Sequence, residues 1–253
     1  MVSETVFIDS NSNSLGENSD SPLPPTPIGA GSTILDPKWV DPSSMPNQQI
    51  ALASYIHPLS DPDAWNRMVG YDKNKITILV ANILNGPDVK PNEKWAGVID
   101  RAIGSGKRVI GYVRTGYLGV SKQKFQTRLG STALSDWVAQ IENDVELWYK
   151  HYPGKISGIF FDEGWNSCGE TLDKTTYADL YRFINDNTKR KHPGAYTVLN
   201  PGDYMPKCFE HSADTLLTFE SSYERYTNNS IYLANRWIPS DPRKLWHIIY
   251  NVP

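Results

Sequence analysis

The chain has 253 residues, of which 39% are hydrophobic and 11% aromatic, so it can bury a large core as one α/β barrel or as two smaller domains. A formal net charge of −3 and the lack of a Lys/Arg cluster disfavour a nucleic acid or another polyanion as partner. No stretch approaches the roughly 18 consecutive apolar residues of a membrane helix, and residues 1–10 lack the basic start and apolar core of an export signal.

Residues 1–48 have the composition expected of a flexible leader. From residue 9 onward they are rich in Ser, Asn, Pro and Gly, and they show no apolar period that could build a core. The folded domain is therefore expected to span residues 49–253.

Strand and helix patterns alternate along residues 49–253. Short β-branched and aromatic runs predict strands, and apolar stripes at helical spacing predict helices between them. The first helix is expected to begin at Ser60, because Ser-Asp-Pro-Asp supplies a capping residue, an early proline and an early acid. The seven expected strands are residues 49–58, 75–82, 108–114, 156–161, 195–199, 215–220 and 245–251, and the later helices are residues 92–103, 132–152 and 176–189.

This alternation predicts a parallel sheet wrapped by helices, and a (β/α)8 TIM-type barrel is the expected fold. Such a barrel needs eight strands, whereas the pattern supplies seven and the seventh ends with the chain. Either the leader contributes a strand or the chain lacks the last β/α unit. We favour the second interpretation, because nothing in residues 9–48 has the pattern of a buried strand.

Two of the expected strands end in an acid that should point into the barrel. In the fourth strand Phe161 suits the helix-facing side, which leaves Asp162 inward. In the sixth strand Leu217 and Phe219 are expected to face the helices, which leaves Glu220 inward at the same edge. Two carboxylates about 5 to 9.5 Å apart, one of them able to stay protonated, are the minimum for glycoside hydrolysis.

A structural explanation competes with catalysis for each acid. A single acid at a strand end more often caps a helix or pairs with Arg or Lys. The matching parity of Asp162 and Glu220 favours catalysis for this pair. Glu163 has the opposite parity, so we expect it to support the pair, either by holding substrate or by tuning the pKa of Asp162 as a like-charged neighbour.

Polar and aromatic side chains gather at the other strand ends as well, Tyr117 among them. Flat rings can support sugar faces, although barrel packing or a local turn is the more frequent role of any one such residue. No His pattern suits a metal, so we expect no metal and no other cofactor. The expected substrate-binding residues are Tyr55, His57, Asn82, Tyr112, Thr115, Trp165, Asn200 and Tyr250.

Six short motifs follow one another at these strand ends: residues 55–58, 82–87, 111–115, 158–163, 199–202 and 218–220. Together they resemble the spherulin-four (spherulation-specific) family over residues 49–253. That family includes fungal glycoside hydrolases of family 135, which act on α-1,4-linked N-acetylgalactosamine and galactosamine in a secreted galactosaminogalactan and have a (β/α)8 barrel. The resemblance implies that the catalytic acids are Asp162, Glu163 and Glu220, and we take Asp162 as nucleophile or charge stabiliser and Glu220 as general acid and base.

The resemblance also implies an amino-sugar polysaccharide as substrate and an extracellular or cell-surface location. Partly deacetylated galactosamine is cationic, so an acidic cleft would attract it. Because no export signal is visible, a cytoplasmic location stays open, and Cys168 and Cys208 fit either one bridge or two free thiols. Two other functions stay open: a carbohydrate-binding or spore-coat barrel without turnover, and a barrel enzyme whose three acids hold a divalent metal.

Overall fold

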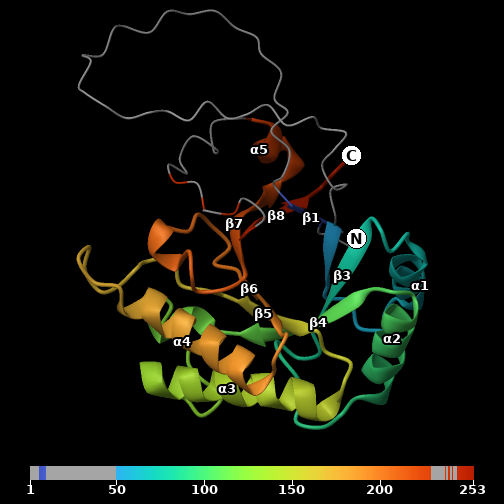
Figure 1. The fold of residues 1–253 in the computed structure, drawn as a ribbon, viewed down its shortest axis with the longest axis horizontal. Coiled ribbons are helices and arrows are strands. Elements are labelled where there is room, and N and C mark those ends of the chain that lie inside the picture. Colours follow the sequence, from blue (N-terminus) through green and yellow to red (C-terminus); the bar gives the residue numbers. More distant parts are fainter. Residues whose placement is uncertain (1–5, 10–49, 229–236, 238, 240, 242–243) are drawn as a thin grey trace, which may run out of the picture.

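The computed structural model describes residues 6–9, 50–228, 237, 239, 241 and 244–253. Eight strands form a closed barrel in chain order, and all seven strands expected from the sequence are present (Figure 1). The strands are β1 (Val6–Asp9), β2 (Ile50–Ser54), β3 (Ile76–Ala81), β4 (Arg108–Arg114), β5 (Gly158–Asp162), β6 (Tyr196–Leu199), β7 (Thr215–Ser222) and β8 (Leu245–Tyr250).

Strands β2 to β8 pair in parallel, whereas β1 runs antiparallel to both of its neighbours. Val6 of β1 lies opposite Leu52 of β2 and Ile249 of β8. Within the described residues, seven parallel strands are therefore present where a complete (β/α)8 barrel has eight, and an antiparallel strand from the leader closes the ring. The assignment of residues 1–48 to a leader is wrong at Val6–Asp9, because four residues are too few for a strand period to stand out. Residues 10–48 lie outside the described part of the chain.

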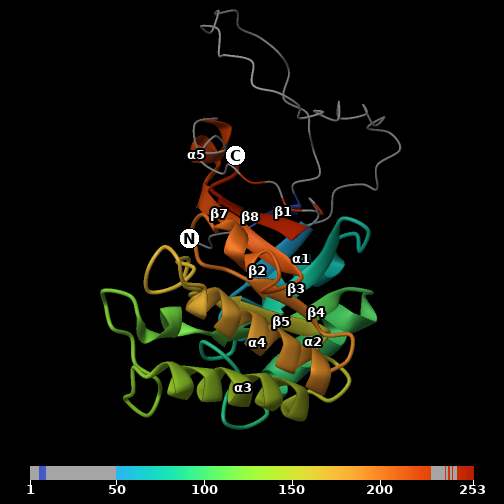
Figure 2. The same cartoon turned by 60° about the vertical axis from the view of Figure 1, so that its left-hand side comes forward.

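The long helices cover one side of the barrel (Figures 1 and 2). Helices α2 and α3 contact β4, while the short α5 contacts β7 and β8. Asp61, rather than Ser60, caps the first helix by accepting a hydrogen bond from the Ala64 N–H at 2.9 Å. The helices are α1 (Pro62–Gly70), α2 (Glu93–Gly104), α3 (Leu134–His151), α4 (Thr176–Lys191) and α5 (Tyr223–Thr227), and the 3-10 turns are η2 (Gly116–Gly119) and η3 (Lys207–Phe209).

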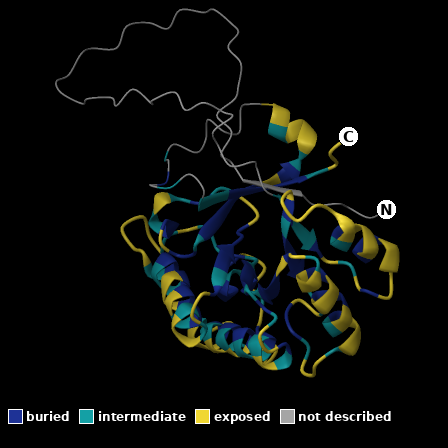
Figure 3. Ribbon diagram, turned by 45° about the vertical axis from the view of Figure 1, so that its right-hand side comes forward, coloured by how far each residue is buried: buried dark blue, intermediate teal, exposed yellow. Residues whose placement is uncertain are grey.

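Two apolar layers hold the barrel together, one inside the strands and one between the strands and the helices. The strands are accordingly mostly buried, while each helix has an exposed face (Figure 3). The outer layer contains four fully buried Trp rings, from α1, α2 and α3. Trp148 of α3 packs onto β4 at Gly111, where a Cβ would meet the indole ring at 2.5 Å, and its indole N–H donates to the Tyr112 carbonyl at 2.7 Å. This contact fixes the strand that carries Tyr112 toward the interior.

A bulge in β7 changes which residues face inward. Leu217 lies in the inner layer, opposite Trp246, and Leu216 lies in the outer one, which is the reverse of the sequence expectation. The register then breaks between Leu217 and Phe219, and Glu220 pairs with the inward-facing Ile248. The extra residue of such a bulge inverts the alternation after it. Glu220 therefore faces inward as expected, but for a different reason.

Candidate active site

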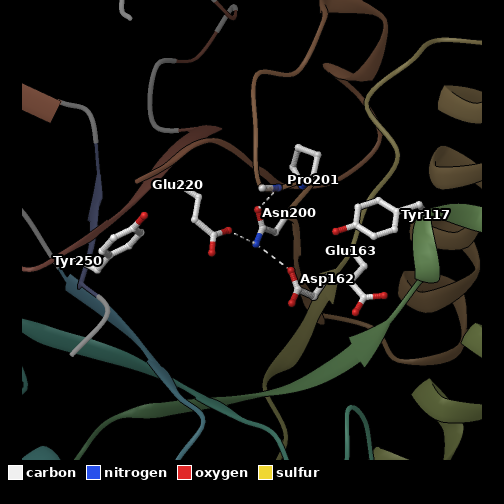
Figure 4. Close-up of a pocket in the computed structure, with 8 residues that line it drawn as sticks. Tyr117, Asp162, Glu163, Asn200, Pro201, Glu220 and Tyr250 are labelled. Atoms are coloured by element: carbon white, nitrogen blue, oxygen red, sulfur yellow. Dashed lines mark hydrogen bonds between the residues drawn. The ribbon is translucent and has the colours of Figure 1, made fainter. Parts of the chain in front are cut away.

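A cavity of about 320 Å³ opens where the parallel strands end, the edge at which barrels of this kind carry their sites (Figure 4). Asp162 comes from the end of β5, Asn200 from the residue after β6, and Glu220 from β7. The cavity is lined by Tyr117, Asp162, Glu163, Asn200, Pro201, Gly202, Glu220 and Tyr250. Five of the eleven expected site residues thus line one cavity: Asp162, Glu163, Asn200, Glu220 and Tyr250.

One amide group joins the two acids. The Nδ2 of Asn200 donates to Asp162 Oδ1 at 2.8 Å and to Glu220 Oε2 at 2.9 Å. Because both bonds share one nitrogen, these two oxygens lie within 5.7 Å of each other, the sum of 2.8 and 2.9 Å. An angle of roughly 120° between the two N–H bonds places them about 5 Å apart. Figure 4 shows the three side chains in a row, with Tyr250 beyond Glu220 and Tyr117 beside Asp162 and Glu163.

Asp162 lies at the inner end of this row. Burial raises its pKa to about 6, against the hydrogen bond that it accepts from the Tyr112 hydroxyl, and the charge of Glu220 raises the pKa further. Burial and the charge of Asp162 raise the pKa of Tyr112, so this phenol stays a neutral donor. The ring of Tyr55 packs edge-on against Tyr112, with ring centroids 5.4 Å apart. Asp162 is therefore an ionisable acid held by two donors, the amide of Asn200 and a phenol.

Glu220 has a different environment, because it is exposed to solvent. Its position depends on the β7 bulge, which turns it inward next to Asn200. A carboxyl group that is reached by solvent can exchange its proton with water and with a group that enters the cavity from outside. The two acids of the pair thus differ in depth and in access to water.

Glu163 turns away from the pair. Its carboxylate accepts a hydrogen bond from Arg114 Nε at 2.6 Å, in an ion pair that is about one quarter exposed on each side. Its backbone has φ +54°, a left-handed conformation that costs energy for a residue with a Cβ. The buried Thr115 hydroxyl donates to the carbonyls of Asp162 and Glu163 at 2.9 and 2.8 Å, so Thr115 holds this turn in place.

Tyr117 reaches the cavity from a strained turn. Residues 116–119 all have positive φ, between 51° and 70°. Glycine at 119 is required for a second reason, because a Cβ there would meet Trp137 at 2.6 Å. The Tyr117 N–H donates to the Glu163 carbonyl at 2.6 Å, and its ring contacts Phe125, which Arg114 covers with its guanidinium group. Strain of this kind is characteristic of functional sites, and here it presents one aromatic ring to the cavity.

The remaining expected binding residues lie behind or beside the cavity. Trp165 contacts the Tyr117 ring edge-on at 6.5 Å and supports it from outside. His57 is a turn residue whose Nδ1 accepts from the Leu59 N–H at 3.2 Å, and Asn82 accepts from the Gly86 N–H at 3.3 Å. Neither His57 nor Asn82 lines the cavity. Tyr117 was expected at a strand end but not among the substrate-binding residues. The Gly-Tyr-Leu-Gly run that follows a buried strand could have indicated that its ring reaches the site.

A disulfide closes the loops around the site. Cys168 and Cys208 are bonded, with their Cα atoms 6.0 Å apart and a separation of 40 positions in sequence. Cys168 follows the turn that carries Glu163, and Cys208 belongs to η3, which follows Asn200. The Gly164 N–H donates to the Asn200 carbonyl at 2.7 Å, so the two loops are also joined through their backbones.

The described residues hold no group of three His, Cys, Asp or Glu side chains arranged to bind a metal ion. None of the helices in the described ranges is long and apolar enough to cross a membrane.

Comparison with known proteins agrees with this fold. The structure resembles that of Aspergillus clavatus Sph3 in complex with GalNAc, at 20% sequence identity and a TM-score of 0.54, over 76% of this chain and 73% of that one. A weaker similarity, at 12% identity and a TM-score of 0.37, links 62% of this chain to 53% of the Legionella pneumophila ChiA C-terminal domain. No curated protein sequence matches the chain. The model of spherulation-specific family 4 matches residues 49–253. The chain belongs to this family.

Proposed function

We propose that the chain is a glycoside hydrolase that cleaves α-1,4-linked galactosamine and N-acetylgalactosamine in a galactosaminogalactan-type polysaccharide. The observation that carries the proposal is the pair Asp162 and Glu220, which face one cavity and are joined by the amide of Asn200. Their facing oxygens, about 5 Å apart, match the spacing of roughly 5 to 5.5 Å that glycosidases retaining the anomeric configuration use. Inverting enzymes need a wider gap of roughly 6.5 to 9.5 Å, which admits a water molecule.

The different environments of the two acids support one division of roles. Asp162 is deeper and accepts hydrogen bonds from Asn200 and Tyr112, which orient it as a nucleophile. Glu220 is exposed, so it can protonate the departing glycosidic oxygen and later remove a proton from water. In the first step the Asp162 carboxylate bonds to the anomeric carbon while the glycosidic bond breaks and Glu220 gives its proton to the leaving oxygen. In the second step Glu220 takes a proton from water, whose oxygen replaces Asp162 at the anomeric carbon.

The chemistry of the cavity supports an amino sugar. Three carboxylates line it, and one of them, Glu163, is paired with Arg114. The remaining negative charge would attract a cationic galactosamine unit, while the Tyr117 and Tyr250 rings offer flat surfaces to sugars. Sph3, which shares the fold, has been crystallised with GalNAc. The disulfide between Cys168 and Cys208 supports an extracellular or cell-surface location, where such bonds persist.

The test is the release of reducing ends from a purified galactosaminogalactan by the full chain. Asp162→Asn and Glu220→Gln should each lower this release by about 10³-fold or more. Glu224→Gln is the control, because Glu224 is an exposed acid of α5 that does not line the cavity. Wild-type activity in either cavity variant would contradict the assignment, and binding of the polysaccharide without release would favour a carbohydrate-binding protein.

A further inference from the structure

Asn200 contacts both proposed catalytic carboxylates through one nitrogen atom. Its side-chain oxygen accepts a hydrogen bond from the Gly202 N–H at 2.7 Å. Only an oxygen can accept that bond, so the amide has a single orientation, with its NH2 group toward the acids. The sequence alone suggested that Asn200 binds substrate, but its two N–H groups are already occupied.

The backbone of Asn200 is fixed as well. Its N–H donates to the Phe161 carbonyl at 2.8 Å, and its carbonyl accepts from the Gly164 N–H at 2.7 Å. These bonds hold it against both sides of the turn that carries Asp162. Asn200 is 3% exposed, so the surrounding structure leaves its amide little freedom to move.

The direction of the hydrogen bonds limits where a proton can reside on the acids. A carboxylate oxygen accepts an N–H far better than the hydroxyl oxygen of a protonated carboxyl group does. The two bonds from Asn200 therefore favour the states in which Asp162 Oδ1 and Glu220 Oε2 carry no proton. The proton that Glu220 gives to the leaving group must then reside on Oε1, the oxygen that Asn200 does not contact.

We infer that Asn200 is the positioning residue of the site: its amide sets the distance between Asp162 and Glu220 and keeps the facing oxygen of each free of a proton. This inference rests on the proposed function, because it takes these two acids as the reacting pair. The substrate need not touch Asn200. Two charge-assisted hydrogen bonds from one rigid donor give both acids a fixed geometry.

The pKa of Asp162 depends on Asn200 and on every titratable or charged group that faces its carboxyl group. The hydrogen bond from Asn200 favours the ionised carboxylate, so its loss should raise the pKa of Asp162. The other titratable or charged groups around Asp162 stay in place when Asn200 is replaced. They are Tyr55 after β2, Tyr112 and Arg114 of β4, Tyr117 of η2, Glu163 after β5, Glu220 of β7 and Tyr250 of β8.

The experiment compares Asn200→Asp and Asn200→Ala with wild type over a range of pH. Asn200→Asp keeps the shape of the side chain and the acceptor for Gly202, but it replaces the shared donor with a third carboxylate. Because the nucleophile must be ionised, kcat/KM of the wild type should fall as pH drops through about 6. In Asn200→Ala this acid limb should move up by about one pH unit, with kcat about 10²-fold lower and KM little changed. Asn200→Asp should move the limb further and lower kcat more.

Asn166→Ala is the matched control. The Asn166 amide donates to the Tyr204 carbonyl at 3.3 Å and so joins the same two loops without touching either acid. It should lower the melting temperature without moving the acid limb. If Asn200 only filled space, Asn200→Asp would behave like wild type and Asn200→Ala like this control.

A titration of Asp162 separates this inference from the proposed function. Carbon-13 labelling of Asp carboxyl groups, with Asp162 assigned from its missing signal in Asp162→Asn, reports its pKa without any substrate. The pKa should be higher in Asn200→Asp than in wild type, even if the chain hydrolyses no polysaccharide. An unchanged pKa of Asp162, together with an unmoved acid limb in an active enzyme, would overturn the inference. Inactivity of the wild type would instead contradict the proposed function alone.

Discussion

The two sides of this barrel are built differently. From β2 to β5 an α-helix of nine residues or more lies between each parallel strand and the next, whereas β6 is followed before β7 by a 3-10 turn alone, β7 leads into the five-residue α5, and β8 pairs with the antiparallel β1. We call these the regular side and the closing side. The proposed nucleophile Asp162 belongs to the regular side and Glu220 to the closing side, with Asn200 at the junction. The reaction therefore depends on how well the irregular half of the barrel is held against the regular half.

The largest expected effect comes from changing the β7 bulge, the feature of the closing side that turns Glu220 inward. An Ala inserted between Phe219 and Glu220 would rotate the carboxyl group to the outer face, because each added residue inverts the alternation of a strand. We expect reducing-end release to fall by about 10³-fold or more, as for the loss of Glu220 itself.

Deletion of Thr218 is the counterpart of this insertion. It removes the extra residue of the bulge but leaves Leu217 and Glu220 opposite their inward-facing partners, Trp246 and Ile248. Activity within about tenfold of wild type is expected after this deletion. An active insertion variant would show that the bulge does not determine the position of Glu220.

The next effect concerns barrel closure. Removing residues 1–9 leaves unpaired edges on β2 and β8, which lose three and four paired residues. At a net ~1 kcal/mol per hydrogen bond, the free energy of unfolding should fall by about 5 kcal/mol, measured by urea denaturation. Removal of residues 1–5 alone is the control. Unchanged stability without Val6–Asp9 would mean that the antiparallel strand does not hold the closing side.

The disulfide should have a smaller effect, since it fastens loops at the junction of the two sides. Replacing Cys168 and Cys208 with Ser should lower the free energy of unfolding by up to about 4 kcal/mol, the chain-entropy value for a loop of this length. The kcat should fall with it, because the loop after β6 carries Asn200. Wild type in reductant should match the double variant, and the double variant should be insensitive to reductant. A wild type equally stable with and without reductant would contradict a structural bond here.

The smallest effect is expected on the regular side, at Tyr117. Its ring lines the cavity, and none of the described hydrogen bonds joins its hydroxyl group to a carboxylate. Tyr117→Ala should raise KM by about tenfold with little change in kcat, the result of losing contact area that substrate and transition state share. Tyr117→Phe keeps the ring and is the control. A large fall in kcat for Tyr117→Phe would assign the hydroxyl a part in the chemistry.

The regular side could be predicted from sequence because its strands are apolar and its helices carry clear stripes. The strand β5 followed the expected alternation, with Phe160 in the inner layer and Phe161 in the outer one. Polar residues at the ends of such strands must meet at one edge of the barrel, which brought Asp162 and Asn200 together as expected.

The closing side could not be predicted as well, because its decisive features leave no pattern. A bulge adds one residue to a strand without changing its composition, so Leu216 and Leu217 were placed on the wrong faces. The strand β1 is four residues long and separated from β2 by forty residues. On the regular side a similar limit applies to Glu163, whose pairing with Arg114 goes with a positive φ that its residue type does not reveal.

The most direct test of the proposed pair is the anomeric configuration of the first products. Purified chain would be mixed with galactosaminogalactan, and the newly formed reducing ends would be followed by proton NMR before mutarotation. With Asp162 and Glu220 joined across about 5 Å, we predict that the α configuration is retained. Initial release of the β anomer would contradict the assignment of Asp162 as nucleophile and Glu220 as acid. No release by a folded chain that binds the polysaccharide would contradict it as well.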